Sequence, residues 1–260
     1  MKISLVSLNQ SWEDKEKNLK KISKIIAYAS QNKVDLIAFP EMTLTGFSNN
    51  IEKLAEDQSN SFSINSIAKL ARDFNISIIF GMIAKSADKG LNKCFLIDNH
   101  GKIIGNYTKI HPFSFANEDK FFISGENLSI VSFKGFRIGI TICYDLRFPE
   151  LYCALAKKCD LIFNIANWPK KRIENWHTLL KARAIENQIF IAGVNRIGVD
   201  GNKLEYKESS YLFDPYGIKI KQKINFSQKI FDLKIAEIDL IRKNFNTIKD
   251  KKYDLYKKII

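Results

Sequence analysis

The sequence has few cysteines and no long apolar run, and both absences narrow its class. Its four cysteines are irregularly spaced and fit neither a disulfide framework nor the C-x-x-C pairs that bind zinc. The longest apolar stretches, such as residues 34–40 and 161–166, are far shorter than the roughly 20 residues that a membrane helix requires. The start of the chain has no small-residue cleavage site and reads as a first β-strand. We therefore expect a cytoplasmic protein without a membrane span.

Linkers, repeats and common cofactor motifs are also missing. With 5 prolines and 12 glycines, the chain has no Pro/Gly/Ser-rich linker and no low-complexity segment. This predicts a single domain over residues 1–260, in which residues 239–260 form a basic C-terminal tail. No histidine pair has H-E-x-x-H spacing, and no Gly-rich loop matches a phosphate-binding or dinucleotide motif. We expect no metal ion and no cofactor.

Acidic residues are outnumbered, with 28 Asp and Glu against 41 Lys and Arg, for a formal net charge of +13. Such an excess invites a nucleic-acid hypothesis, because clustered cations release counterions from phosphate backbones. However, the lysines spread from Lys2 to Lys258, and cations and aromatic residues are not interleaved in one patch. This distribution favours a solvated lysine-rich surface. A basic nucleic-acid-binding protein remains the alternative from a different class, and it predicts binding that weakens steeply with salt.

Strand-like and helix-like patterns alternate along the chain, which predicts a layered α/β domain. A hairpin turn is expected at Lys134-Gly135, and its second arm ends at Cys143. The predicted helices cover residues 13–30, 64–74, 149–157 and 172–187. The predicted strands cover residues 2–8, 34–39, 76–83, 93–98, 128–133, 136–142, 160–165, 189–194, 209–213 and 229–238.

Glu41 is the first residue that could carry chemistry, in the segment FPEMTLTGF after a buried strand. Strand ends are where open α/β sheets gather ligand-binding residues. Partial removal of water there makes a carboxylate a useful proton acceptor and donor near neutral pH. Taken alone, a solvated loop glutamate is the commoner situation.

Lys109, in YTKIHPF, lies among aromatic and apolar neighbours. Its ammonium can lower the pKa of a nearby thiol and stabilise a tetrahedral oxyanion. In a chain with this many lysines, a surface charge is the simpler interpretation of one lysine.

Cys143 stands where a strand runs into the polar turn of CYDLRFPE before a helix. Nucleophiles favour this geometry, because the side chain is clear of the strand and backbone N–H groups can face an oxyanion. The other cysteines, Cys94, Cys153 and Cys159, lie inside apolar segments and are expected to be inert.

A cysteine–histidine pair is a second possibility for the nucleophile, because the chain has three histidines. His100 occupies an Asn-His-Gly turn and His177 lies on a predicted helix. His111 follows Lys109 by two residues and can satisfy hydrogen bonds beside a site. None of the three has a pattern that favours it as the base.

Taken together and in this order, the three segments resemble the Glu-Lys-Cys triad of the nitrilase (carbon-nitrogen hydrolase) superfamily. The resemblance extends from the first strand through Asp214-Pro215-Tyr216-Gly217 and weakens in the tail. It implies an α/β fold with a four-layer α-β-β-α sandwich. It also implies that Cys143 is the nucleophile of a thioester mechanism, Glu41 the base and Lys109 the cationic partner. Glu118 matches a second glutamate of the family and would orient the lysine.

Three further segments, at residues 166–169, 181–187 and 194–198, resemble the bacterial ω-amidase branch. Similar enzymes hydrolyse the terminal amide of 2-oxo acid amides such as 2-oxoglutaramate or 2-oxosuccinamate. The resemblance implies that Asn167 and Trp168 contact the substrate.

Two residues of the turn after Cys143 are candidates for contacts with the substrate. The backbone N–H of Tyr144 is expected to face the oxyanion. An anionic substrate needs a cation, and Arg147 is the candidate because guanidinium binds carboxylates bidentately. A structural ion pair of Arg147 with Asp145 or Glu150 is equally compatible with the sequence.

The expected partners are a small amide and water, with no nucleic acid and no membrane. Members of the superfamily usually pair through a helical face, so we expect a homodimer or a higher homo-oligomer that uses residues 172–187 and 239–260. The rival enzyme hypotheses are another amidase of the superfamily, an N-carbamoyl amidase and a nitrilase. A pseudoenzyme scaffold is disfavoured by the intact triad.

Overall fold

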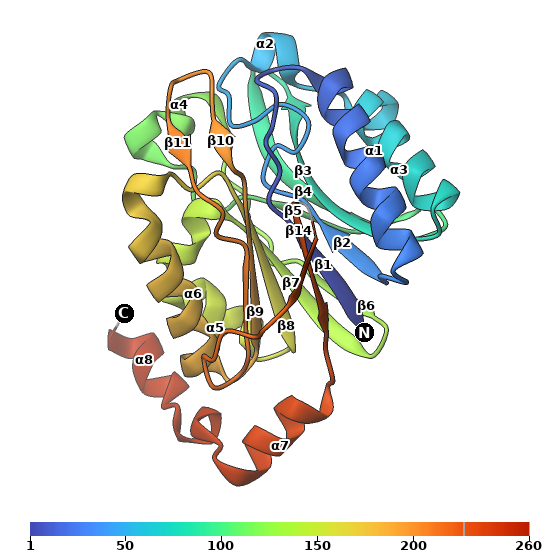
Figure 1. Ribbon diagram of the computed structural model, residues 1–260. Helices are drawn as coiled ribbons and strands as arrows, with labels where there is room; N and C mark the ends of the chain where they lie inside the picture. The colour runs from blue at the N-terminus through green and yellow to red at the C-terminus, as the bar shows by residue number, and fades with distance from the viewer. Residues whose placement is uncertain (226, 260) are drawn as a thin grey trace.

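Two β-sheets packed face to face form the centre of the computed structural model, which describes residues 1–225 and 227–259 (Figure 1). In the described residues the larger sheet has seven strands in the order β13-β14-β1-β2-β3-β4-β5. Strands β1, β2 and β3 are parallel, and their neighbours are antiparallel. The strands are β1 (Lys2–Val6), β2 (Leu36–Ala38), β3 (Ser77–Ser86), β4 (Lys89–Ile97), β5 (Ile103–Thr108), β13 (Lys223–Asn225) and β14 (Gln228–Asp232).

The smaller sheet has five strands in the order β12-β9-β8-β7-β6 over the same described residues. Its central strands β7, β8 and β9 are parallel, with an antiparallel strand at each edge. The strands are β6 (Ile130–Phe133), β7 (Phe136–Ile142), β8 (Leu161–Ala166), β9 (Phe190–Asn195) and β12 (Tyr211–Phe213), and a separate pair consists of β10 (Gly198–Val199) and β11 (Glu205–Tyr206).

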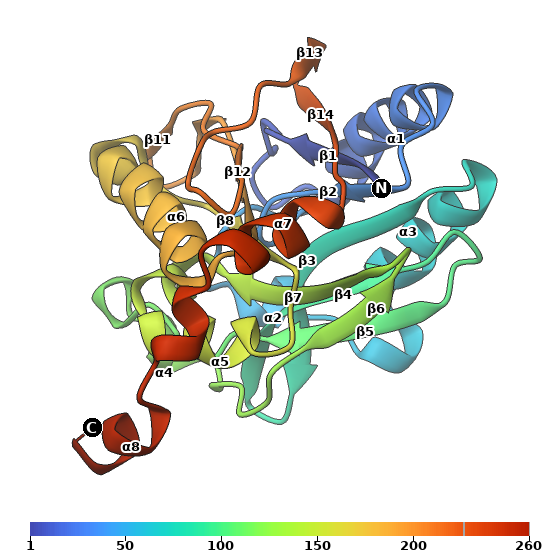
Figure 2. The same cartoon turned by 90° about the horizontal axis from the view of Figure 1, so that it is seen from below.

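Helices cover the outer face of each sheet (Figures 1 and 2). Helices α1 and α3 pack on the larger sheet, and α5 and α6 pack on the smaller one. The α-helices are α1 (Lys15–Gln31), α2 (Ile51–Leu54), α3 (Phe62–Asp73), α4 (Glu118–Phe121), α5 (Pro149–Ala156), α6 (Ile173–Asn187), α7 (Ala236–Asn244) and α8 (Tyr253–Ile259). The 3₁₀ turns are η1 (Gln58–Asn60), η2 (Ser114–Ala116), η3 (Cys143–Arg147), η4 (Lys170–Arg172) and η5 (Thr247–Asp250).

The apolar core lies in three layers, one between the sheets and one between each sheet and its helices, because apolar side chains recur with the strand period and the helix period. Between the sheets, inward side chains such as Ile79 and Phe163 are fully buried. Ile22 and Ile26 of α1 lie one turn apart and face the larger sheet, while Leu180 of α6 faces the smaller one. This arrangement is the predicted four-layer α-β-β-α sandwich, so the predicted fold class is confirmed.

The carboxyl ends of three strands, β2, β5 and β7, set the position of the candidate residues. Glu41 lies three residues after β2, Lys109 directly after β5, and Cys143 directly after β7.

No helix among the described residues combines the length and apolar character that a membrane crossing needs.

One strand prediction is wrong in its second half. The expected strand over residues 229–238 ends at Asp232, and α7 begins at Ala236. Ile238 and Ile241, which are three residues apart, are the buried positions of α7, so the helical period rather than alternation governs this segment. In the view of Figure 2, the segment that contains α8 extends beyond the body of the sandwich.

Candidate active site

Three of the predicted residues meet in a buried charge cluster. The Nζ of Lys109 lies 3.1 Å from Oε1 of Glu41 and 2.8 Å from Oε2 of Glu118. The side chains of Lys109, Glu41 and Glu118 are 1%, 0% and 0% exposed, respectively. Solvent therefore does not screen this cluster, and each charge depends on its partners in the protein.

Both oxygens of Glu41 accept further hydrogen bonds. Oε1 accepts from Nδ2 of Asn92 at 2.7 Å, and Oε2 accepts from the backbone N–H of Asn167 at 3.0 Å. The next residue, Met42, has a left-handed φ of 46°, which turns the chain sharply after the carboxylate. A Cβ on Gly81 of β3 would come within 2.6 Å of the Met42 nitrogen, so only glycine lets β3 pass this close to the turn.

Glu118 is held in a comparable way at the start of α4. Its Oε1 accepts from Asn92 at 2.9 Å, and its Oε2 accepts from the backbone N–H of Phe113 at 2.6 Å. Asn117, the residue before it, is left-handed with φ 57°. Asn92 thus links the two carboxylates through the same Oε1 atoms that the ammonium of Lys109 contacts, and the sequence alone did not single it out.

The charge state of Lys109 is fixed by its neighbours. Burial by itself would lower the pKa of the ammonium, but Glu118 and then Glu41 outweigh it and raise the pKa above its usual value. The lysine is therefore protonated throughout the pH range in which proteins are stable.

Cys143 begins η3 in a left-handed conformation, with φ 46°. For a residue with a Cβ this conformation is strained, and it is typical of nucleophiles placed on a sharp strand-to-helix turn. Burial and then Glu41 raise the pKa of the thiol well above its usual value, while Lys109 opposes the shift. At neutral pH the resting side chain is therefore a thiol, and forming the thiolate requires a base.

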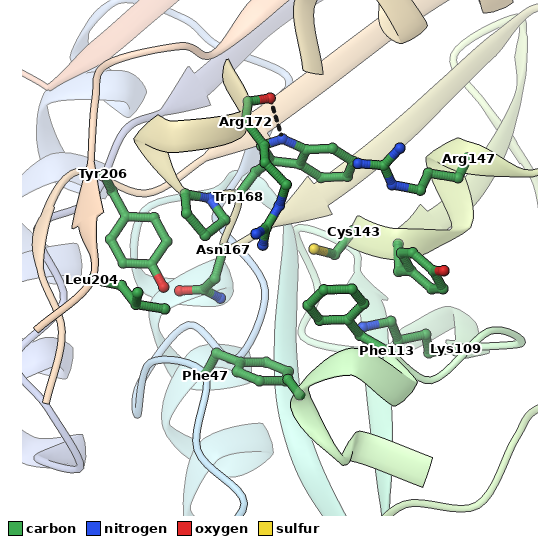
Figure 3. Close-up of a pocket in the computed structure, with 13 residues that line it drawn as sticks. Phe47, Lys109, Phe113, Cys143, Arg147, Asn167, Trp168, Arg172, Leu204 and Tyr206 are labelled. Carbon is green, nitrogen blue, oxygen red and sulfur yellow. Dashed lines mark hydrogen bonds between the residues drawn. The ribbon is translucent and has the colours of Figure 1, made fainter. Parts of the chain in front are cut away.

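A pocket of about 500 Å³, open space at its mouth included, lies over Cys143 and Lys109 (Figure 3). The residues that line it are mostly aromatic and apolar, and two arginines also line it. The wall residues are Phe47, Phe113, Ala116, Tyr144, Trp168, Pro169, Leu204 and Tyr206. The arginines are Arg147 and Arg172.

The two arginines are stacked on aromatic rings and carry no partner acid. Arg147 lies over Trp168 at 5.2 Å, and Arg172 lies over Phe113 at 5.4 Å. Within the described part of the chain neither arginine forms an ion pair; the one side-chain hydrogen bond of Arg147 goes to Asn175 at 3.5 Å. Its expected alternative pairing with Asp145 or Glu150 is therefore wrong.

The other predicted residues lie around the same pocket. Asn167 donates its Nδ2 to the Glu41 carbonyl at 2.7 Å, while its buried Oδ1 has no hydrogen-bond partner. Trp168 is buried, and its indole N–H donates to the Arg172 carbonyl at 2.8 Å. Tyr144 lines the pocket beside the cysteine.

Arg172 and Asn92 were missed by sequence reasoning. Arg172 stands at the end of the basic run 170–172, where a specific cation cannot be told from solvated lysines. Asn92 lies one residue before the strand predicted over 93–98; in the structure it is a buried polar residue of β4, where burial demands a partner.

The histidines do not contact the thiol. The Nδ1 of His111 is hydrogen-bonded to Asp145, and His177 of α6 stacks against Tyr211 and Phe213. No group of three or more His, Cys, Asp and Glu side chains with metal-binding geometry occurs in residues 1–225 and 227–259.

Known proteins resemble this chain over nearly its whole length. The family model described as carbon-nitrogen hydrolase matches residues 2–242. The protein named omega-amidase YafV from Escherichia coli (strain K12) is 34% identical over 84% of this chain and 82% of its own length. The 2-oxoglutaramate amidase of Bacillus subtilis (strain 168) is 29% identical over 98% of each chain.

A solved structure adds a spatial comparison. A Xanthomonas campestris protein, described as a CN-hydrolase superfamily member with an arsenic adduct in its active site, superposes with a TM-score of 0.87. It is 31% identical and covers 96% of this chain and 97% of its own. The match therefore extends to the sheets that carry the charge cluster and the pocket.

Proposed function

This chain belongs to the carbon-nitrogen hydrolase family, and from that premise we propose that it hydrolyses the terminal carboxamide of a small dicarboxylic acid monoamide. A 2-oxo acid amide, such as 2-oxoglutaramate or 2-oxosuccinamate, is the expected substrate, which makes the enzyme an ω-amidase. Two relatives named omega-amidase and 2-oxoglutaramate amidase support this choice. The observation that carries it is the presence in one pocket of a half-buried cysteine and two arginines that lack acidic partners.

The first step forms a bond between Sγ of Cys143 and the amide carbon. Because the pKa of the thiol is raised, the attack needs a base, and Glu41 is proposed to take the proton. The electron pair of the carbonyl moves onto its oxygen. The ammonium of Lys109 and the backbone N–H of Tyr144 are the proposed donors to this oxyanion.

In the second step the carbon–nitrogen bond breaks. Glu41 returns its proton to the nitrogen, so that ammonia leaves and a thioester on Cys143 remains. Glu41 then takes a proton from water, whose oxygen attacks the thioester carbon. The carbonyl re-forms as the carbon–sulfur bond breaks, and the proton on Glu41 passes to Sγ, so that the acid departs and the thiol is restored. Glu118 is proposed to hold the ammonium of Lys109 in place throughout, which the 2.8 Å contact supports.

The pocket supports an anionic rather than a neutral amide. A guanidinium without an acidic partner can bind a carboxylate bidentately, and stacking on Trp168 and Phe113 holds both groups in place. We propose that Arg147 and Arg172 together bind the carboxylate end, while Cys143 faces the amide.

Substrate profiling with a cysteine variant tests the proposal. Ammonia release is measured with 2-oxoglutaramate and succinamate, beside glutamine, a simple nitrile and N-carbamoyl-β-alanine. We expect turnover of the first two compounds and a loss of about 10⁴-fold or more in C143A, as for removal of a covalent nucleophile. Turnover of another compound would assign a different amidase, carbamoyl amidase or nitrilase activity to the same cysteine.

Arginine variants test the carboxylate contact separately. We expect R147A and R172A each to raise the KM for the anionic amide by about tenfold or more, the loss of one charged hydrogen bond. K171A, which removes a neighbouring exposed cation outside the pocket lining, is the matched control and should leave the KM unchanged. An unchanged KM in R147A would remove this residue from the binding site.

Assembly and location complete the proposal. We propose a homodimer that uses α6 and the segment 239–260, since Leu240, Phe245 and Leu255 expose 57%, 68% and 53% of their surface. Light scattering on the purified protein measures the mass directly, and a monomer at micromolar concentration would contradict the dimer. Four free cysteines fit a reducing cytoplasm.

A further inference from the structure

Asp145 is a buried carboxylate outside the charge cluster. It lies two residues after Cys143, is 0% exposed, and has four donors. Oδ1 accepts from the backbone N–H of His111 at 3.0 Å and pairs with its Nδ1 at 2.8 Å. Oδ2 accepts from the hydroxyl of Tyr107 at 2.8 Å and from the backbone N–H of Ile142 at 3.0 Å. A buried aspartate with this many donors holds its position tightly.

These donors come from both sides of the site. Ile142 is the last residue of β7 and directly precedes Cys143, so its bond closes the turn on which the thiol stands. Tyr107 belongs to β5, and His111 follows Lys109 by two residues. Asp145 therefore joins the turn that carries the sulfur to the segment that carries the ammonium.

His111 also contacts the far end of the same turn. Its ring is stacked on Phe148, the residue after η3, with centroids 3.7 Å apart and planes 11° from parallel. The imidazole thus contacts the turn at Asp145 and at Phe148. The left-handed backbone of Cys143, at the start of this turn, is strained and needs such support.

We propose that Asp145, with His111 as its donor, is a positioning site that keeps the Sγ of Cys143 aligned with the Lys109 ammonium. The inference rests on the proposed nucleophilic role of Cys143. It assigns no proton transfer to either residue. Its effect is on alignment, where a misplacement of about 1 Å can lower the rate about 100-fold.

Four variants test the proposal. In D145N one oxygen becomes an NH₂ donor that faces backbone donors, so the junction is disrupted. H111F keeps a ring against Phe148 but loses the Nδ1 donor, whereas H111N places an amide N–H where Nδ1 was. D160N is the matched control: Asp160 is another buried aspartate, which binds the backbone and guanidinium of Arg137 at the opposite end of β7.

Two readouts separate alignment from folding. The first is the rate of alkylation of Cys143 by iodoacetamide, followed by peptide mass spectrometry so that the other cysteines are counted apart. The second is the split between kcat and KM for the amide. Thermal unfolding of each variant reports the loss of stability.

We expect D145N to slow alkylation and to lower kcat by about 100-fold at an unchanged KM, and H111F to do so by about tenfold. H111N should restore most of the loss seen in H111F. D160N should lower the melting temperature yet keep both rates within about threefold of wild type, because it acts far from the turn.

The proposal is overturned if folded D145N and H111F keep wild-type rates, or if D160N loses as much activity at an equal loss of stability. If D145N does not fold, the comparison of H111F with H111N decides. Alkylation does not depend on the substrate, so a wild type that hydrolyses no amide but shows the same alkylation pattern would contradict the proposed function and retain the positioning role.

Discussion

The two ends of the β-sandwich use the same kinds of charged pair in different surroundings. At the amino ends of the parallel strands, Lys134 meets Asp35 and Arg137 meets Asp160, and the cations are 56% and 49% exposed. At the carboxyl ends, Lys109 is 1% exposed and its two glutamates are fully buried. The Lys134–Asp35 pair joins two loops and the Arg137–Asp160 pair joins a strand to a loop, whereas the Lys109 cluster lies beneath a pocket.

The difference in exposure determines whether the charges at each end contribute to stability or to chemistry. An exposed pair contributes about 0–1 kcal/mol to stability, because solvent screens it. A buried cluster costs desolvation that its own attraction barely offsets, so stability does not explain why Glu41, Lys109 and Glu118 are gathered there. Their place beside a strained cysteine does explain it, since buried charges act strongly on a reaction that develops charge.

Removing the cation at each end is the strongest way to test this comparison. K109M leaves two buried carboxylates without an ammonium, and we expect a loss of about 3–5 kcal/mol in the free energy of unfolding. Amide turnover should fall by about 10³-fold or more, as for removal of an oxyanion donor. K134M removes an exposed partner of Asp35, and we expect a loss of at most about 1 kcal/mol.

Urea unfolding and initial rates on the same preparations measure both quantities. Equal losses of stability in K109M and K134M would contradict the distinction between the two ends. A stable K109M with full activity would also remove Lys109 from the proposed mechanism.

Two glycines allow the same comparison for the backbone. A Cβ at position 81 would come within 2.6 Å of the Met42 nitrogen, so G81A displaces the turn after Glu41. We expect kcat to fall about 100-fold, the scale for a misplacement of about 1 Å. Gly135, in the hairpin at the other end, has φ 80° and open space around the Cβ position. G135A should cost about 1 kcal/mol through backbone strain and leave kcat unchanged.

Steady-state kinetics and thermal unfolding of the two alanine variants give the result. If G135A loses as much kcat as G81A, the effect is one of general strain and does not depend on the site.

A smaller effect is expected for the amide that links the two carboxylates. In N92L the leucine is close in size to asparagine but donates no hydrogen bond to Glu41 or Glu118. Each carboxylate loses one of its donors, at a cost of about 1–3 kcal/mol. We expect about a tenfold fall in kcat, because Lys109 still holds both groups. Wild-type kcat in a folded N92L would show that Asn92 only fills space.

The layers of the fold could be predicted from the sequence, but one of the strands that position the site could not. Strand β5 precedes Lys109 and was not predicted, since residues 103–108 do not alternate cleanly. It lies at the edge of the larger sheet, where one side is partly exposed. The segment after Asp232 misled in the opposite way: the predicted strand continued to Ile238, although Ile238 and Ile241, three residues apart, are the buried positions of α7.

The site shows the same limit. Glu41 and Cys143 could be proposed because each follows a predicted strand directly or within a short turn, and Lys109 because of its aromatic and apolar neighbours. Arg172 and Asn92 could not, because their roles depend on which segments the fold brings together. The alternatives for Arg147 illustrate this: nearby acids in the sequence suggested an ion pair, yet Asp145 is occupied by His111.

The smallest expected effect is that of C143A on the pH dependence of stability, because this variant removes only the thiol and leaves Glu41, Lys109 and Glu118 in place. Because burial and Glu41 raise the pKa of Cys143, the folded chain retains this proton at a pH where the unfolded chain has lost it. The corresponding stability is present below the unfolded pKa of about 8.5 and is lost as pH rises toward the folded pKa.

The difference in unfolding free energy between C143A and wild type should therefore grow in favour of C143A above pH 8.5, by at most about 1.4 kcal/mol per pH unit. Other titrating groups are common to both proteins and cancel in the difference. Urea unfolding at several pH values between 7 and 10 measures it. A difference that stays constant over this range would mean that folding does not raise the pKa of Cys143, because the folded and unfolded chains would then lose this proton at the same pH.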